Sequence, residues 1–249
     1  MPCSAAPASL PDQDSREGRE LSLRFSHVSV PGITFLALCL CIALGATRSL
    51  DWWGQSLLAR LSFSLLDLTG SLLTFLGEAP ITGAIAMVLA VRGWRHRRGR
   101  GLGPLLLFAG VGLELLLKYI LTHPAPPAGF DRHLPGAKLL HLSASLALPI
   151  SFPSSFSPAQ LYSFPSGHML RSTFLMAVAS DRKPQWRRAG WLVVVAMAVT
   201  RVYCNEHWMS DVVGGVLLGW TLAAVATAWE HEQRQDAGEV EGNATRLRQ

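Results

Sequence analysis

The feature that most constrains this chain is a series of long apolar blocks separated by short charged segments. Hydrophobic residues make up 49% of the 249 residues, and only 16% of the residues are charged. The hydrophobic residues form blocks rather than amphipathic stripes, and the longest blocks approach the ~20 residues that cross a bilayer core as a helix. The sequence therefore predicts an all-α, polytopic membrane protein.

The blocks define six predicted membrane segments and two polar ends. The segments cover residues 31–49, 76–93, 103–121, 166–181, 187–204 and 210–229. We predict a disordered or interfacial N-terminal segment at 1–29, a six-helix membrane domain at 30–230 and a cytoplasmic polar tail at 231–249. No small-residue cleavage site clearly follows the first block, so this block is interpreted as a retained anchor.

Residues 51–75 are the ambiguous stretch. They are apolar but interrupted by Asp51 and Asp67, and the adjacent Trp52 and Trp53 suit a position at headgroup level. This pattern favours one or two interfacial amphipathic helices after the first span. A seventh span through this stretch is the alternative.

Basic residues decide between the two topologies. They gather after the second segment, at 92–100, and after the fourth, at 182–188, and further arginines precede the first block. Positive charge near membrane ends marks the cytoplasmic side. Six spans place both termini and both basic connections on that side. Seven spans would put the N-terminal arginines on the side opposite to both basic connections. Because the basic residues lie in short segments that flank the apolar blocks, as orientation signals do, nucleic-acid binding is not expected. The four cysteines show no metal-ligand spacing.

A set of ionisable residues and their neighbours lies at the outward ends of four segments. Charged groups inside membrane segments are costly, so they mark a function. The set comprises Lys118 at the end of the third segment, Ser166, Gly167 and His168 at the start of the fourth, Arg201 at the end of the fifth, and His207 and Asp211 at the start of the sixth.

Together these residue types predict a phosphate site. His207 and Asp211 are one helical turn apart. A carboxylate on one imidazole nitrogen fixes the tautomer and leaves the other nitrogen free to act as a nucleophile. Arg201 offers a planar fork to phosphate oxygens, Lys118 adds a second cation, and a helix beginning near Ser166 favours an anion at its N-terminus. No carboxylate cluster indicates Mg²⁺ or Zn²⁺, so we expect neither a metal nor a cofactor.

Taken singly, these residues have simpler interpretations. Lys118 alone would be a side chain that reaches to the interface, and Asp211 alone would be a helix-end charge. His123, His133 and His141 are interpreted in this way, as interfacial residues outside the site. The combined pattern of two cations, two histidines and an aspartate is much harder to explain without a phosphate site.

Two motifs carry a family resemblance. Residues Pro165 to His168 read PSGH, and the run from Arg201 to Asp211 reads Arg-VYCNE-His-WMS-Asp. With these motifs the chain resembles the type 2 phosphatidic acid phosphatase (PAP2) superfamily, membrane lipid phosphatases related to vanadium haloperoxidases and glucose-6-phosphatase. The resemblance covers roughly residues 60–225 and fits the layout of six spans.

The first motif of the family is incomplete here. The family pattern is a lysine, six residues and Arg-Pro, whereas Lys118 is followed by YILTHP and then by Ala125 and Pro126. The alanine removes a phosphate-binding cation. By analogy with a lost oxyanion donor, such a loss costs on the order of 10²–10³ in rate.

Two arginines are candidates to replace the missing one. Arg171 lies three residues beyond His168 and is expected on the same helix face; the alternative for Arg171 is a structural pairing with Glu114. Arg132, in the outer loop, is the second candidate. Glu114 lies four residues before Lys118 and is expected to form an intrahelical ion pair with it.

The resemblance implies a mechanism for these residues. His207 would attack phosphorus and form a phosphohistidine, Asp211 would orient it, and His168 would protonate the leaving oxygen and then activate water. The phosphoryl oxygens would be held by Lys118, Arg201 and the backbone of Ser166 and Gly167, with Arg171 as the added cation.

The expected substrate is a lipid phosphate or diphosphate, such as undecaprenyl diphosphate, phosphatidate or phosphatidylglycerol phosphate. The expected location is a bacterial inner membrane, with both termini cytoplasmic and the site facing the periplasm or exterior. A lipid phosphotransferase using the same intermediate is one alternative. A non-catalytic binder of lipid phosphates, favoured by Ala125, is another.

Overall fold

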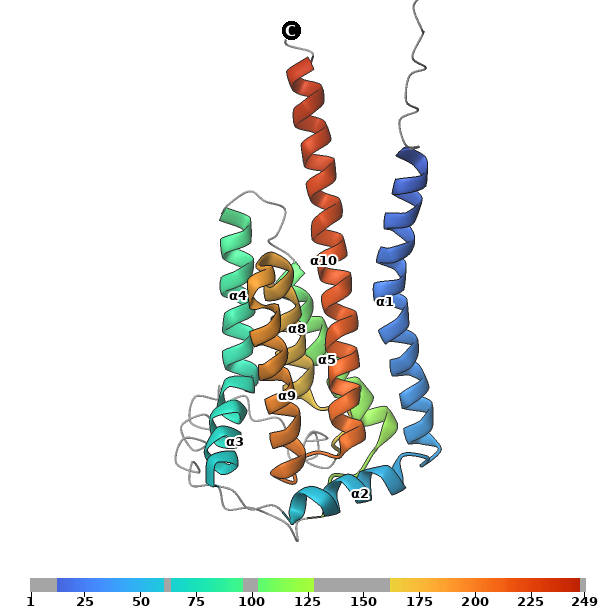
Figure 1. The fold of residues 1–249 in the computed structure, drawn as a ribbon, viewed down its shortest axis with the longest axis vertical. Helices are drawn as coiled ribbons and strands as arrows, with labels where there is room; N and C mark the ends of the chain where they lie inside the picture. The colour runs from blue at the N-terminus through green and yellow to red at the C-terminus, as the bar shows by residue number, and fades with distance from the viewer. Residues whose placement is uncertain (1–12, 61–63, 96–102, 128–161, 247–249) are drawn as a thin grey trace, which may run out of the picture.

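The computed structural model describes residues 13–60, 64–95, 103–127 and 162–246. In these ranges the chain is helical, apart from turns and one isolated antiparallel bridge between Pro124 and Tyr162. The elements are α1 (Gln13–Ala43), α2 (Arg48–Ala59), α3 (Ser64–Gly77), α4 (Ala79–Arg95), η1 (Gly103–Leu105), α5 (Leu106–Leu121), α8 (Gly167–Arg182), η4 (Pro184–Trp186), α9 (Arg187–Tyr203) and α10 (Met209–Arg246). In Figure 1, α1, α4, α5, α8, α9 and α10 run along the long axis, and α2 lies across one end.

Helix α8 is the centre of this bundle and packs against α10, α9, α5, α4 and α3. Its approach to α10 is close because Gly215 and Gly219 on α10 face backbone oxygens of α8. A Cβ at these two positions would collide with the carbonyl oxygens of Ser166 and Leu170. Small residues allow such close helix crossings in membrane proteins. The start of α8 and the start of α10, which carry the two intact motifs, are thereby held together.

The chain turns sharply after α1, and α2 braces the start of α10. Gly45 has a φ of +70°, which glycine adopts without steric penalty, and α2 is bent by 93° from α1. Asp51 on α2 is buried and accepts hydrogen bonds from the backbone N–H and the hydroxyl of Ser210, each at 2.8 Å. The carboxylate that interrupts an apolar stretch thus satisfies a free N–H in the first turn of α10.

Membrane-length helices are present among the described residues. Two of them, Gly103–Leu121 and Met209–Gln233, are long and apolar enough to cross a bilayer. The pairs α1 with α2 and α3 with α4 qualify only when each is taken as one bent segment, with bends of 93° and 54°. Helices α8 and α9 coincide with predicted segments but have only 16 and 17 residues, with buried polar side chains. The helical architecture is confirmed, and the count of six spans stays a prediction.

The predicted polar ends are partly helical. Helix α1 begins at Gln13, within the segment expected to be disordered or interfacial, and α10 continues to Arg246 through the expected polar tail. The helices therefore extend beyond the predicted limits of the membrane domain, and the division into three segments stays a prediction. Arg132, His133 and His141 lie outside the described residues.

Candidate active site

The histidine and aspartate of the third motif lie at the start of α10. Asp211 is completely buried, and its Oδ2 accepts a hydrogen bond from the backbone N–H of Trp208 at 2.8 Å. His207, in the turn before the helix, places Nδ1 3.5 Å from the same oxygen. This separation suits an ion pair but is longer than a good hydrogen bond. Such contacts often tighten only when substrate is bound.

A second histidine holds the other oxygen of Asp211. His123 follows α5, and its Nδ1 lies 3.0 Å from Asp211 Oδ1. The backbone around His123 is fixed as well, because its carbonyl accepts a hydrogen bond from the N–H of Ser163 at 2.9 Å and the carbonyl of Pro124 accepts one from the indole of Trp208 at 2.8 Å. The interpretation of His123 as a plain interfacial residue therefore needs correction: the residue contacts the predicted catalytic aspartate. Its place between Lys118 and the missing arginine of the first motif was the available signal.

Glu114 links two of the predicted phosphate-binding cations. Its Oε1 accepts a hydrogen bond from Lys118 Nζ at 2.9 Å, and its Oε2 accepts one from Arg171 Nη1 at 3.2 Å. All three side chains are buried, where an unpaired charge would be strongly unfavourable. The predicted Lys118–Glu114 pair is present. Arg171 does pair with Glu114, the alternative considered for it, and it also lines the cavity described below.

The carboxylate of Glu114 lies against the start of α8. A Cβ at Gly167 would collide with both of its oxygens, so only glycine leaves room for the acid there. The N-terminus of a helix favours negative charge, and here the protein's own carboxylate supplies it. Ser166 is completely buried, and its backbone N–H donates to the carbonyl of Asp211 at 3.0 Å. The Ser166 N–H is thus engaged inside the protein.

His168 lies at the α3–α4 corner. Its ring packs on Gly77, where a Cβ would lie 2.6 Å from its Cδ2. Its Nε2 is 3.8 Å from Glu78 Oε1 and has no hydrogen bond to any described group. The carbonyl of Gly77 also accepts a hydrogen bond from Arg171 Nε at 3.1 Å. A corner between two helices, without any recognisable motif, thus contacts two predicted site residues.

Arg201 lies behind this cluster, in the last turn of α9. It is completely buried and donates hydrogen bonds to Glu206 Oε2 and to the hydroxyl of Thr74 on α3. Glu206, directly before His207, is the more exposed partner of this ion pair. Every predicted phosphate-binding cation is therefore paired with a glutamate.

A cavity of about 420 Å³ joins most of these groups. Among the predicted site residues it is lined by Lys118, Gly167, His168, Arg171 and His207; Glu114, Glu206 and Ala125 line it as well. Ser166, Arg201 and Asp211 lie outside the lining and contact it through neighbours. Among the residues that the structure describes, no group of three or more His, Cys, Asp or Glu is arranged to hold a metal ion.

Comparisons with known proteins agree with this arrangement. The model of the PAP2 superfamily matches residues 101–235, more than half of the chain. The fold is similar to the crystal structure of a transmembrane PAP2 type phosphatidylglycerolphosphate phosphatase from Bacillus subtilis, with a TM-score of 0.61 and 19% identity over 83% of this chain and 97% of that chain. None of the curated proteins compared with the chain matches it. The chain, a phosphatase built on membrane-length helices, therefore belongs to the PAP2 superfamily.

Proposed function

We propose that this protein is an integral membrane lipid phosphatase that hydrolyses a lipid phosphate or diphosphate through a phosphohistidine intermediate. One observation carries the proposal: Lys118, His168 and His207 come from three separate parts of the chain and line one cavity. A cation, an acid and a nucleophile around one space are what transfer of a phosphoryl group to an enzyme requires.

The first step transfers the phosphoryl group to His207. As the 3.5 Å contact tightens, Asp211 would accept a hydrogen bond from Nδ1–H of His207, which keeps the proton on Nδ1 and leaves Nε2 with a free lone pair for attack on phosphorus. The N–P bond forms as the P–O bond to the lipid breaks. His168 donates its proton to the departing lipid oxygen, which leaves as an alcohol or, from a diphosphate, as a lipid monophosphate.

The second step returns the enzyme to its starting state. The neutral His168 takes a proton from water, whose oxygen attacks the phosphohistidine as the N–P bond breaks. Inorganic phosphate is released and both histidines regain their initial protonation. Neither step needs a metal ion, because the surrounding cations stabilise the transferring group.

Phosphate binding requires an exchange of partners. Glu114 and Glu206 occupy Lys118, Arg171 and Arg201 in the structure. An entering phosphate would share these cations with the glutamates. We propose that Arg171 supplies the cation that Ala125 does not, because both residues line the same cavity while Arg171 reaches it from α8.

His123 is proposed as a positioning residue. Its bond to Asp211 Oδ1 fixes the carboxylate plane, so that Oδ2 stays directed at His207. A partner that orients a functional group is typically worth a factor of 10–100 in activity, by analogy with residues behind metal ligands.

The lipid class follows from the position of the site. The cavity opens at one end of a bundle of membrane-length helices, where a lipid presents its phosphate while its chains remain in the bilayer. With six spans, the positive charge of the connections at 92–100 and 182–188 favours cytoplasmic termini and a site on the outer face. Undecaprenyl diphosphate, phosphatidate and phosphatidylglycerol phosphate are the candidate substrates in a bacterial inner membrane. The B. subtilis structure of similar fold is described as a phosphatidylglycerolphosphate phosphatase.

The proposal is tested by phosphate release from these three lipids in detergent with EDTA, comparing the wild type with His207→Ala. We expect activity that EDTA leaves intact and that the substitution removes. Labelled substrate should leave acid-labile, base-stable phosphate on the wild type and none on His207→Ala. Loss of activity in EDTA would refute the metal-free mechanism.

Ala125 specifically favours the second candidate, a protein that binds lipid phosphates without turnover. Saturable binding of the three lipids, with neither phosphate release nor a labelled enzyme, would establish this binding function. Transfer of label to a second lipid instead of water would establish a phosphotransferase.

A further inference from the structure

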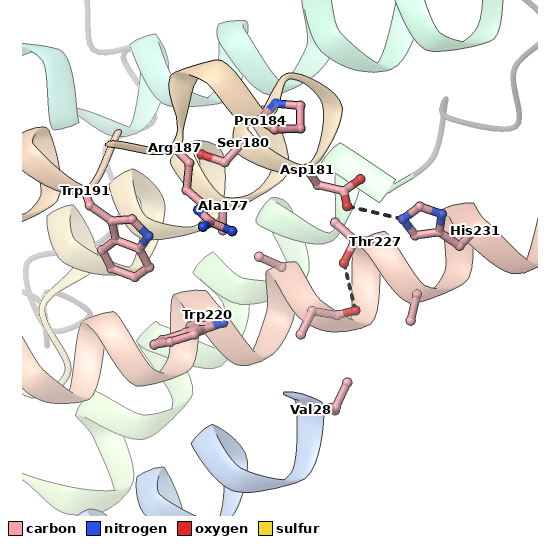
Figure 2. Close-up of a pocket in the computed structure, with 13 residues that line it drawn as sticks. Val28, Ala177, Ser180, Asp181, Pro184, Arg187, Trp191, Trp220, Thr227 and His231 are labelled. Atoms are coloured by element: carbon pink, nitrogen blue, oxygen red, sulfur yellow. Dashed lines mark hydrogen bonds and ion pairs between the residues drawn. The ribbon is translucent and has the colours of Figure 1, made fainter. Parts of the chain in front are cut away.

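A second cavity lies at the opposite end of α8 from the histidines. Its volume is about 460 Å³, and it is lined by α8, α9 and α10 with Val28 of α1 at its edge. Figure 2 shows Arg187, Trp191, Trp220 and the Asp181–His231 pair around it. Gly167 and Asp181 are separated by 14 residues of one helix, or roughly 20 Å at the helical rise per residue. The groove is therefore a separate site from the candidate active site.

The charge in this groove is unbalanced. Asp181, the single acidic residue of its lining, is already engaged with His231, whose Nε2 lies 3.2 Å from Asp181 Oδ1. Arg187 is exposed and makes no hydrogen bond or ion pair with any residue that the structure describes. Figure 2 shows its guanidinium reaching into the space between α8, α9 and α10.

The neighbouring Arg182 has the paired environment expected of an arginine with a structural role. Arg182, at the end of α8, forms a 2.7 Å ion pair with the buried Glu230 and donates a hydrogen bond to the carbonyl of Leu89. Arg187, only five residues later, has no such partner within the described part of the chain. Its guanidinium is available to a ligand.

The apolar part of the groove suits an acyl chain next to a headgroup. Trp191 and Trp220 meet edge to face, with ring centroids 5.3 Å apart, and Ala177, Ala223 and Ala224 leave open space beside them. Tryptophan and arginine together are typical of the level where headgroups meet hydrocarbon. Basic pockets between membrane helices bind the headgroups of anionic lipids.

We propose that this groove is a binding site for an anionic phospholipid of the leaflet opposite to the active site. The lipid phosphate would contact Arg187 through a charge-assisted hydrogen bond, and one acyl chain would lie along the Trp191–Trp220 pair. The site is independent of the proposed phosphatase mechanism, since none of its residues belongs to the catalytic cavity.

The test is retention of lipid by the purified full-length protein in detergent, measured by native mass spectrometry during titration with phosphatidylglycerol or phosphatidylcholine. Arg187→Gln removes the charge and keeps the space, and Ala224→Phe fills the space and keeps the charge. Arg187→Gln should weaken phosphatidylglycerol retention about tenfold, the size of one charge-assisted contact. Ala224→Phe should weaken it as well, because the larger side chain excludes the acyl chain from the groove. Arg188→Gln is the matched control, because Arg188 is the adjacent exposed arginine and lies outside the groove; it should change retention by less than about twofold.

Three results would overturn the proposal: equal retention of the two lipids by the wild type, retention unchanged in both groove variants, or an equal loss in Arg188→Gln. Phosphate release is measured on the same preparations. Because the groove lies away from the histidines, its variants should keep wild-type phosphatase activity, which also shows that they are folded.

Discussion

The two ends of α8 differ in the burial and pairing of the basic side chains around them. At its start, Lys118, Arg171 and Arg201 are buried and each is paired with a glutamate. At its far end, Arg187 is exposed and unpaired among the described residues. Burial explains the difference, because a buried charge needs a partner while an exposed one is stabilised by water or headgroups. A ligand at the start of α8 must therefore compete with glutamates for the buried cations. A ligand at the far end meets an arginine that has no partner among the described residues.

The largest expected effect breaks the chemistry at the start of α8. His207→Ala should lower phosphate release by about 10⁴ or more, because loss of a nucleophile removes the covalent route. Release from lipid phosphates in detergent measures this, with Arg188→Gln as the folded control of unchanged activity. Activity within tenfold of the wild type would exclude His207 as the nucleophile.

A smaller loss is expected when a paired cation is removed. Arg171→Ala should lower kcat/KM by about 10²–10³, the cost of one lost donor to the transferring group. Because this change leaves Glu114 without one partner, Arg171→Ala is compared with Arg171→Ala/Glu114→Gln, in which the carboxylate is neutral. Placing the family's arginine back, as Ala125→Arg in the double variant, should restore at least part of the rate.

The rescue by Ala125→Arg also distinguishes a phosphate-binding role of Arg171 from a purely structural one. A purely structural arginine would be compensated by Glu114→Gln alone, and Ala125→Arg would add nothing. Rescue that depends on Ala125→Arg assigns Arg171 to the phosphate, since Ala125 lines the same cavity from the connection after α5.

Next in size is the loss of the bond between His123 and Asp211. His123→Ala should lower kcat by about 10–100-fold with little change in KM, because the residue orients another group instead of contacting substrate. His123→Asn, whose amide N–H can occupy the position of Nδ1, should recover part of kcat. An equal loss in both variants, or an effect confined to KM, would contradict a positioning role.

The brace between α2 and α10 should affect stability more than chemistry. Asp51→Ala leaves the Ser210 N–H without its partner and is expected to destabilise the protein by about 1–3 kcal/mol. The midpoint of thermal unfolding in detergent should fall accordingly. Ser56→Ala, an exposed change on the same helix, is the control and should leave the midpoint unchanged.

The smallest expected effect is on activity at the far end of α8. Arg187→Gln should keep phosphate release within about twofold of the wild type, since an exposed charge at this distance is screened. A large loss of activity in detergent would mean that the two ends are coupled and would remove the contrast between them.

The sequence by itself predicted the helical membrane architecture and singled out five of the residues that line the cavity at the start of α8: Lys118, Gly167, His168, Arg171 and His207. It did so because length and hydropathy of a block encode membrane burial, and because spacings such as the four residues between His207 and Asp211 are fixed within one helix. The Lys118–Glu114 pair is predictable for the same reason. In each case the interacting groups lie on one continuous element.

Only the tertiary structure decided which groups meet across elements. His123 and Asp211 are 88 residues apart, and Arg171 meets the carbonyl of Gly77 from another helix. Arg187 has no partner among the residues that the structure describes. These contacts depend on how closely helices cross, as at Gly215, and on the directions of side chains there. Neither the hydrophobic periodicity nor the residue spacing of a single segment predicts such geometry, because it arises from packing between segments that are distant along the chain.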